Sequence, residues 1–200
     1  GDHFAIGQLF FTKKLKSITS KLEEILNKES LTLVAIREVP VQKDILGKIA
    51  LDCLPNIYQI FIKPKSKDFN HQEFETKLLQ ARKFIEEIFM DDEILYICSM
   101  SSKTIVYKGL MLPKAITDFY LDLNQKDFRA STCVFHQRFS TNTSPRWHLA
   151  QPFRLLAHNG EINAIRGNRN WVKARSSKFS TPLIPKIQKF KQLVNEFGSD

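Results

Sequence analysis

The chain has few cysteines and none near its start. The three in the sequence are Cys53, Cys98 and Cys133. An odd number at wide spacing argues against a disulfide framework. The lack of a Cys-x-x-Cys pair or a helical His-x-x-x-His pair argues against a metal site. All three cysteines lie in apolar stretches, so we expect buried, reduced thiols, as is usual in an intracellular protein.

Other absences narrow the class of protein further. The sequence has no run of 18 apolar residues, which argues against a membrane-spanning helix. It has no Gly-x-Gly-x-x-Gly or other phosphate-binding glycine loop, so no motif indicates a nucleotide-binding fold. It also has no internal repeat, low-complexity tract or signal-peptide pattern. With 42% hydrophobic residues among 200, its composition is that of an ordinary globular domain.

The formal net charge is +9, and most of it comes from lysines scattered along the chain. No dense basic block interleaved with aromatic residues occurs, so the charge indicates a solvated surface rather than a nucleic-acid interface. One alternative stays open. Arg166, Arg169, Lys173 and Arg175 share a predicted helix and could contact phosphates in a basic nucleic-acid-binding module without catalysis.

Hydrophobic periodicity predicts both strands and helices. Runs of apolar residues predict strands at 4–11, 31–36, 57–62, 94–99, 104–107, 131–137 and 153–157. Apolar spacing of three and four residues, with Pro113 as a helix start, predicts helices at 18–27, 45–51, 71–90, from 113, 163–175 and 185–196. Strands and helices alternate early and hairpin-like pairs come later, which favours an α+β layered domain over a doubly wound parallel sheet.

Polar residues follow two of the predicted strands directly. Arg138 follows the strand at 131–137, and Asn159 and Gly160 follow the strand at 153–157. If these strands are neighbours, the three residues emerge at one edge of the sheet. A guanidinium suits a substrate carboxylate. A side-chain amide beside a backbone N–H that no Cβ shields can form an oxyanion hole.

Each of these residues also has a simpler interpretation. Asn-Gly is a strong hairpin-turn signal, and an arginine after a strand is often a surface ion pair. His136 and His158 might suggest metal ligands, but their spacing gives no support for a metal site.

Taken together, the motifs are more specific than any one of them. The stretch that carries them reads His-Gln-Arg-Phe-Ser-Thr-Asn-Thr from His136, Ala-Gln-Pro from Ala150 and His-Asn-Gly-Glu-Ile-Asn from His158. Earlier stretches, Arg-Glu-Val-Pro-Val from Arg37 and Thr-Ile-Val-Tyr-Lys-Gly from Thr104, fit the same pattern. Over nearly all 200 residues the chain resembles the glutaminase domain of glutamate synthase large chains.

The resemblance implies a fold and a reaction. The fold is a four-layer αββα sandwich of the N-terminal-nucleophile type, and residues 1–200 would form part of a single class-II amidotransferase domain. In that family an N-terminal cysteine attacks the side-chain amide of L-glutamine, and its own α-amino group is the base. The ammonia released passes to a synthase domain and reacts with 2-oxoglutarate to make glutamate. That domain carries FMN and an iron–sulfur cluster, and ferredoxin or an NAD(P)H-oxidising subunit supplies the electrons.

Three groups of site residues can be carried over by resemblance. Arg138 resembles the residue that binds the substrate α-carboxylate, Asn159 and Gly160 resemble the oxyanion pair, and Asp200 resembles the acid that binds the α-ammonium group. The extended Ser-Thr-Asn-Thr and Asn-Gly-Glu-Ile-Asn context favours glutamate synthase over other class-II amidotransferases, such as those of purine or amino-sugar synthesis.

The sequence departs from the family at its start, where the nucleophilic cysteine is missing. We therefore expect an internal piece of a longer enzyme, incomplete at the N-terminus. The nucleophile segment would lie upstream and the synthase and FMN segments downstream. This piece should bind no cofactor or metal itself and should be inactive alone. Weak similarity over 96–99 and 119–123 favours the ferredoxin-dependent type. The lysine- and isoleucine-rich composition fits a plastid genome or an AT-rich bacterium, so we expect this enzyme of nitrogen assimilation in a plastid stroma or otherwise in the cytoplasm.

Overall fold

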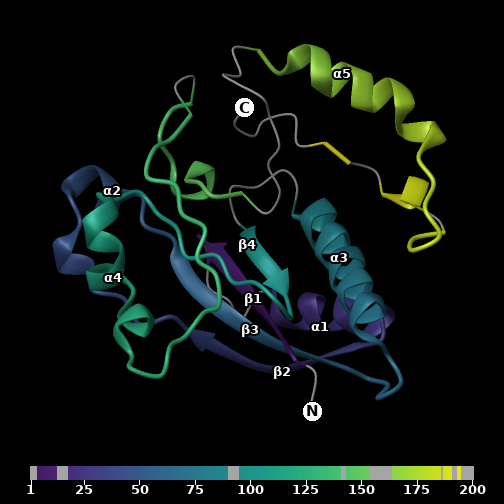
Figure 1. Cartoon of the computed structure of the whole chain (residues 1–200), viewed down its shortest axis with the longest axis horizontal. Coiled ribbons are helices and arrows are strands. Elements are labelled where there is room, and N and C mark those ends of the chain that lie inside the picture. Colours follow the sequence, from purple (N-terminus) through teal and green to yellow (C-terminus); the bar gives the residue numbers. More distant parts are fainter. Residues whose placement is uncertain are drawn as a thin grey trace.

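The computed structural model describes residues 4–12, 18–89, 95–140, 143–153, 164–185, 187–190 and 193–194. At their centre is a four-stranded antiparallel sheet in the order β2-β3-β1-β4 (Figure 1). Its strands are β1 (Ala5–Phe11), β2 (Leu31–Glu38), β3 (Asn56–Pro64) and β4 (Leu95–Ser101). All four coincide with strands predicted from the sequence. Helices and an antiparallel sheet confirm the predicted α+β class.

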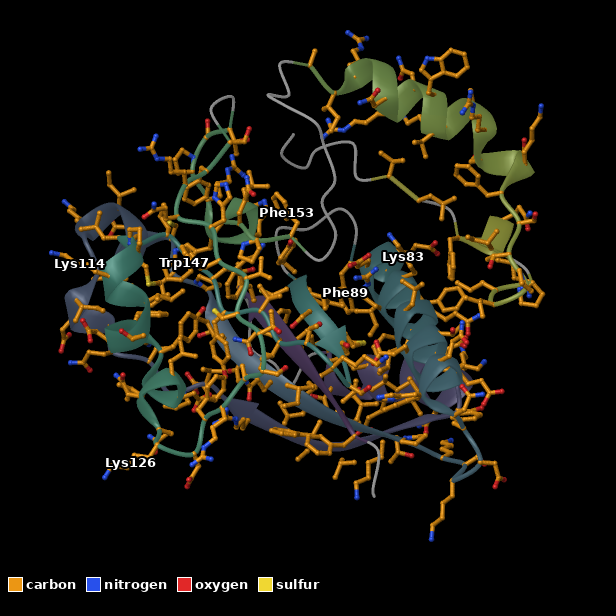
Figure 2. All side chains as sticks on the ribbon, viewed as in Figure 1. Lys83, Phe89, Lys114, Lys126, Trp147 and Phe153 are labelled. Atoms are coloured by element: carbon orange, nitrogen blue, oxygen red, sulfur yellow. The ribbon has the colours of Figure 1, made fainter. Side chains whose placement is uncertain are left out.

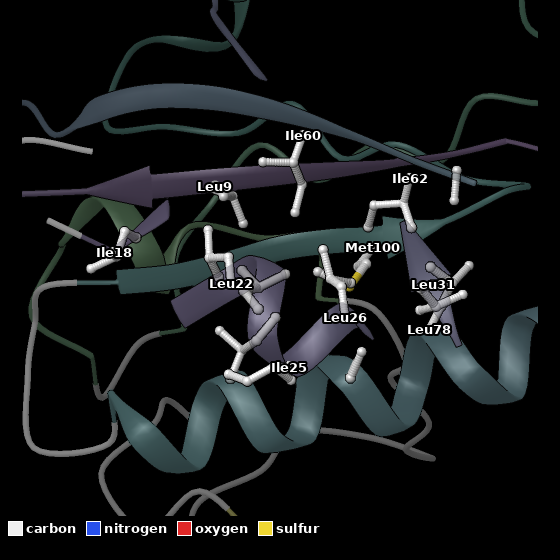
Figure 3. Packing of buried hydrophobic residues seen from close by; sticks show 14 of the residues in the cluster. Leu9, Ile18, Leu22, Ile25, Leu26, Leu31, Ile60, Ile62, Leu78 and Met100 are labelled. Atoms are coloured by element: carbon white, nitrogen blue, oxygen red, sulfur yellow. The ribbon is translucent and has the colours of Figure 1, made fainter. Parts of the chain in front are cut away.

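One face of the sheet is covered by α1 (Thr19–Lys28) and α3 (His71–Ile88) (Figures 1 and 3). Each helix buries a single apolar stripe, as the three- and four-residue spacing predicts. The stripes are Leu22, Ile25 and Leu26 in α1 and Phe74, Leu78, Ala81 and Ile85 in α3. The start of α3 is fixed by a capping box in which the Asn70 side chain accepts from the Glu73 N–H and the Glu73 carboxylate accepts from the Asn70 N–H, both at 2.9 Å.

The opposite face is covered by short and irregular segments. They include α2 (Lys48–Asp52), α4 (Ile116–Phe119) and 3₁₀ turns at Lys43–Ile45, Pro113–Ala115, Leu121–Asn124 and Trp147–Leu149. Aromatic side chains form the core here, chiefly Phe10, Phe119, Tyr120 and Trp147. We call these four aromatic residues, together with the buried residues packed against them, the aromatic cluster. A lone bridge between Val41 and Tyr120 joins two of the segments.

Two predicted strands are not strands in the structure. Residues 104–107 form no ladder with β4; instead, the Val106 N–H donates to the Ser99 hydroxyl at 3.1 Å. Residues 131–137 are irregular, and Val134 and Phe135 are 77% and 80% exposed. A strand needs a neighbour for its backbone groups, and the described residues supply none for 131–137. Most of the predicted strand at 153–157 lies outside the described residues.

The predicted helices of the last third are only partly correct. The helix expected at 163–175 is α5 (Arg166–Arg175), followed by a 3₁₀ turn at Ser176–Lys178. Where 185–196 is described, it contains only a 3₁₀ turn, Ile187–Lys189. Phe190 nevertheless packs edge-on against Phe84 of α3, with 5.3 Å between ring centroids. In the described part of this region, the ring of Phe190 rather than a helical face makes the contact with α3.

Within the described ranges, no helix combines the length and apolar character needed to cross a lipid bilayer. The expectation that all three cysteines are buried is wrong for two of them. Cys98 lies in the aromatic cluster, whereas Cys53 and Cys133 are exposed.

Gly7 in β1 lies where the sheet leaves no room for a side chain. A Cβ there would lie 2.6 Å from Cγ1 of the fully buried Ile60 on β3. We expect Gly7→Ala to lower the free energy of unfolding by about 1–3 kcal/mol, since over-packing forces neighbours out of their rotamers. Gly167→Ala is the matched control, because a Cβ at this position in α5 meets nothing within 4 Å. It should leave stability unchanged or slightly raised. Urea unfolding measures both, and equal stability of the two variants would contradict the close approach.

Candidate functional site

Arg138 is the only predicted site residue that the structure describes. It lies in the irregular, exposed stretch that was predicted as a strand, and its own side chain is exposed. Its backbone N–H donates to Nδ1 of His136 at 3.1 Å, which closes a tight local turn. No carboxylate among the described residues pairs with its guanidinium. The guanidinium is therefore available to an anionic ligand rather than used in a surface ion pair of the described part.

Asn159, Gly160 and Asp200 lie outside the described residues. Their predicted convergence with Arg138 stays a prediction. The chain that leads toward Asn159, however, is described as far as Phe153, and its anchoring to the sheet is well defined.

Trp147 fixes this segment to the aromatic cluster. Its indole is 4% exposed, and Nε1 donates to the backbone oxygen of Ala50 at 3.0 Å. The ring lies edge-on to Phe10, with 6.0 Å between centroids, and 5.5 Å from Phe119. Figure 2 shows Trp147 on the side of the sheet where α2 and α4 lie. Gly109 makes the fit possible, since a Cβ there would lie 2.5 Å from the indole.

Lys108, beside Gly109, is a buried cation that sequence reasoning missed. It is 1% exposed. Its Nζ donates to the hydroxyl of Tyr96 at 3.1 Å and to the backbone oxygen of His148 at 2.8 Å. The same Nζ lies 4.5 Å from the ring centroid of Tyr96 and 4.9 Å from that of Phe153. The sequence signal is a lysine directly after the run 104–107 that was predicted as a strand, within the family-like stretch Thr-Ile-Val-Tyr-Lys-Gly.

A partly buried network of polar side chains crosses the sheet. Arg37 on β2 donates to the Gln59 side-chain oxygen through Nε at 2.8 Å and through Nη2, and pairs with both oxygens of Asp122. Gln59 in turn donates to the Gln8 side-chain oxygen at 2.8 Å and to the Tyr107 hydroxyl at 3.1 Å. Tyr107 donates to Asp122 at 3.1 Å. This network ties the 105–124 segment to the sheet, and its bonded groups are engaged with one another rather than aimed at a ligand, whereas the buried side-chain nitrogen of Gln8 has no hydrogen-bond partner within the described part of the chain.

The described residues offer no place for a metal or a cluster. No group of three or more His, Cys, Asp or Glu side chains in the described ranges could hold a metal ion. An open hollow of about 380 Å³ lies between α3 and β4. Its polar lining includes Glu75 and Thr104, and Glu75 already accepts from Ser101 at 3.0 Å and from the Ser102 hydroxyl at 2.6 Å. None of the predicted site residues lines it.

The whole chain, residues 1–200, matches the family model of class-II glutamine amidotransferases. The chain belongs to that family. The exposed guanidinium of Arg138, with which no described carboxylate pairs, and the anchored 147–153 segment therefore lie within an amidotransferase domain. Membership also favours the amidotransferase interpretation over the nucleic-acid-binding one, which has only the exposed charges of α5 in its support.

The relatives of this amidotransferase domain include glutamate synthases of several kinds. It is 41% identical over 187 residues to ferredoxin-dependent glutamate synthase 1, chloroplastic/mitochondrial, of Arabidopsis thaliana, with 90% of this chain and 12% of the relative covered. It is 39% identical over 189 residues to the NADPH glutamate synthase large chain of Azospirillum brasilense (92% and 12% covered) and 36% identical over 209 residues to the NADH glutamate synthase of Saccharomyces cerevisiae (98% and 10% covered). The chain spans about a tenth of the length of these curated relatives. The similarity to glutamate synthases read from the motifs is thus confirmed.

Burial in the polar network raises the pKa of the Tyr107 hydroxyl to about 12, and the nearby Asp122 carboxylate adds to the shift. Burial also raises the pKa of Tyr120 well above its ordinary value, and that of Tyr58 to a lesser extent. The folded protein holds these protons more tightly than the unfolded chain. These tyrosines therefore add stability below pH 10, and the part that Tyr107 contributes is lost as the pH rises from about 10 toward 12.

We expect native tyrosine ionisation, followed by phenolate absorbance, to be displaced to higher pH than in urea. Tyr107→Phe should remove the native step near pH 12. A native titration that coincides with the unfolded one at pH 10 would contradict the burial of these hydroxyls.

Proposed function

We propose that this chain is part of the glutaminase domain of a glutamate synthase, which hydrolyses L-glutamine to glutamate and ammonia. The observation that carries the proposal is the match of the entire chain to class-II amidotransferases, together with 36–41% identity to glutamate synthases that use different electron donors. A region shared by enzymes with different reductants serves the step they have in common, and glutamine hydrolysis uses no electrons.

The chemistry divides among four groups. A cysteine at the head of the mature enzyme, outside this chain, attacks the amide carbon, with its own α-amino group as base. Asn159 and the Gly160 N–H stabilise the negative oxygen of the tetrahedral intermediate. Arg138 binds the α-carboxylate of glutamine as a planar bidentate donor, and Asp200 binds the α-ammonium group. Because glutamine is a zwitterion, its site needs one cationic group for the carboxylate and one anionic group for the ammonium. The exposed guanidinium of Arg138 supports the assignment of Arg138 to the carboxylate.

The complete domain would be the four-layer αββα sandwich of the N-terminal-nucleophile type. Two features of the described residues support this. The second face of the sheet has a large aromatic core under irregular segments. In addition, Val134 and Phe135 are exposed in a stretch with the composition of a strand. Burying such side chains stabilises by about 1.5–3 kcal/mol each, so further chain from the same domain would gain by covering them.

The rest of the proposed enzyme lies outside this chain. Ammonia would pass to a synthase domain that holds FMN and an iron–sulfur cluster and uses 2-oxoglutarate. Ferredoxin is the favoured electron donor over an NAD(P)H subunit, since several of the similar proteins carry ferredoxin in their names. The chloroplastic relatives favour the plastid stroma, with the cytoplasm as the alternative.

Arg138 gives a direct test in the full-length enzyme. Loss of a charged hydrogen bond costs about 1.5–3 kcal/mol, so Arg138→Ala should raise KM for glutamine roughly 10- to 100-fold, while Arg138→Lys should recover part of the affinity. Arg129→Ala, an exposed arginine of the same stretch, is the matched control. Glutamate synthesis from added ammonia should be unchanged in all three. An unaltered glutamine KM in Arg138→Ala would overturn the assignment.

The nucleophile gives a second test. A polypeptide that starts at Gly1 has no N-terminal cysteine, and Cys98 is buried. We expect this polypeptide to release no ammonia from glutamine in an ammonia-detection assay in which the full-length enzyme is active. Turnover by the short polypeptide that disappears on replacing Cys53 or Cys133 would show a different nucleophile and contradict the proposal.

A further inference from the structure

Lys108 has an unusual combination of burial and contacts for a lysine. Its ammonium group is withdrawn from water, at a cost that must be offset by hydrogen bonds or opposite charge. Among the described residues, the groups that offset this desolvation cost are the Tyr96 hydroxyl, the His148 backbone oxygen and the faces of the Tyr96 and Phe153 rings. None of these contacts follows from the local conformation of residues 104–109.

These contacts join two regions that are far apart in the sequence. On one side, Tyr96 belongs to β4 of the sheet, and the backbone oxygen of Lys108 accepts from the buried Tyr120 hydroxyl at 2.7 Å. On the other side, His148 and Phe153 belong to the segment that follows Trp147. Lys108 is therefore held at its backbone by the aromatic cluster, and its side chain holds the 148–153 segment at a second point, in addition to the Trp147–Ala50 bond.

The segment so held continues into the proposed oxyanion hole. Phe153 precedes Asn159 by six positions and Gly160 by seven, so the place where 148–153 is fixed limits where the two donors can lie. An oxyanion hole is effective only when its donors are fixed before the charge develops, and a displacement of about 1 Å can cost on the order of 100-fold in rate.

We propose that Lys108 is a positioning residue for glutamine hydrolysis, which fixes the 148–153 segment and through it the oxyanion donors Asn159 and Gly160. This inference rests on the proposed function. It predicts an effect on kcat rather than on KM, because Arg138, which is proposed to bind the substrate carboxylate, lies in a different stretch and, as far as the structure describes the chain, makes no hydrogen bond or ion pair with Lys108.

The test compares variants of the full-length enzyme. Lys108→Met keeps the length of the side chain but loses the donor and the charge. We expect its glutaminase kcat to fall about 10- to 100-fold, with KM for glutamine within about threefold of wild type and with synthesis from added ammonia retained. Lys108→Arg, which can still stack on both rings, should recover part of kcat. Lys114→Met, at an exposed lysine, should match wild type.

A double-mutant cycle separates positioning from general stability. If Lys108 acts through the oxyanion donors, Lys108→Met should cost little further kcat in an Asn159→Ala background, because the group that it positions is already gone. Fully additive losses would overturn the proposal. So would a Lys108→Met kcat within twofold of wild type, or a parallel loss of ammonia-dependent synthesis. If Lys108→Met does not fold, Phe153→Leu decides instead: it removes one ring contact, and an unchanged kcat would overturn the proposal.

The same experiments distinguish the failure of this proposal from that of the proposed function. Normal glutaminase activity in Asn159→Ala would remove the oxyanion assignment itself, whatever Lys108 does. An inactive Asn159→Ala beside a normal Lys108→Met would leave the proposed function intact and remove only the positioning role.

Discussion

The structure depends on one antiparallel sheet whose two central strands are covered on both faces. β1 pairs with β3 on one side and β4 on the other, and six of its seven residues are buried. Such a strand must be apolar on both faces or must satisfy its polar groups internally. Both solutions occur here. Leu9 and Phe11 face the helices, Phe10 faces the aromatic cluster, and Gln8 bonds to Gln59 of the neighbouring strand.

The two faces of the sheet are stabilised in different ways. On the helical face, α1 and α3 satisfy their own backbone groups, so packing needs only apolar stripes. On the other face the irregular segments have backbone groups without regular partners, and side chains from elsewhere supply bonds to them. The Trp147 indole donates a hydrogen bond to the backbone oxygen of Ala50, and the Tyr120 hydroxyl donates one to that of Lys108. The Lys108 ammonium group donates one to the backbone oxygen of His148. Irregular backbone held by such specific bonds can present groups to a ligand in ways that a regular helix cannot.

The sequence predicted the elements whose signals are local. The stripes of α1 and α3 and the apolar runs of the four strands were correct because periodicity follows burial on one face or two. Residues 131–137 have the same composition as these strands, yet they form none, since pairing depends on a partner that the local sequence does not specify. For the candidate site, the motifs identified the family and Arg138. They could not give the exposure of Arg138, which follows from the irregular path of its stretch.

Lys108 illustrates why a residue of this kind escapes sequence reasoning. A lysine followed by glycine is usually read as a solvated turn, because isolated charges are rarely buried. Burial became possible here because three partners arrive from β4, from residue 148 and from residue 153, and none of them is near it in the sequence. A hydrophobic side chain at this position could fill the same space, but it could not bond to the His148 oxygen, which would then lack this donor inside an apolar cluster. The ammonium group of Lys108 therefore fills space and also orients the backbone of the 148–153 segment through a directional hydrogen bond. An interaction that sets direction is what the segment leading to Asn159 and Gly160 requires if their donors are to point at one oxygen atom.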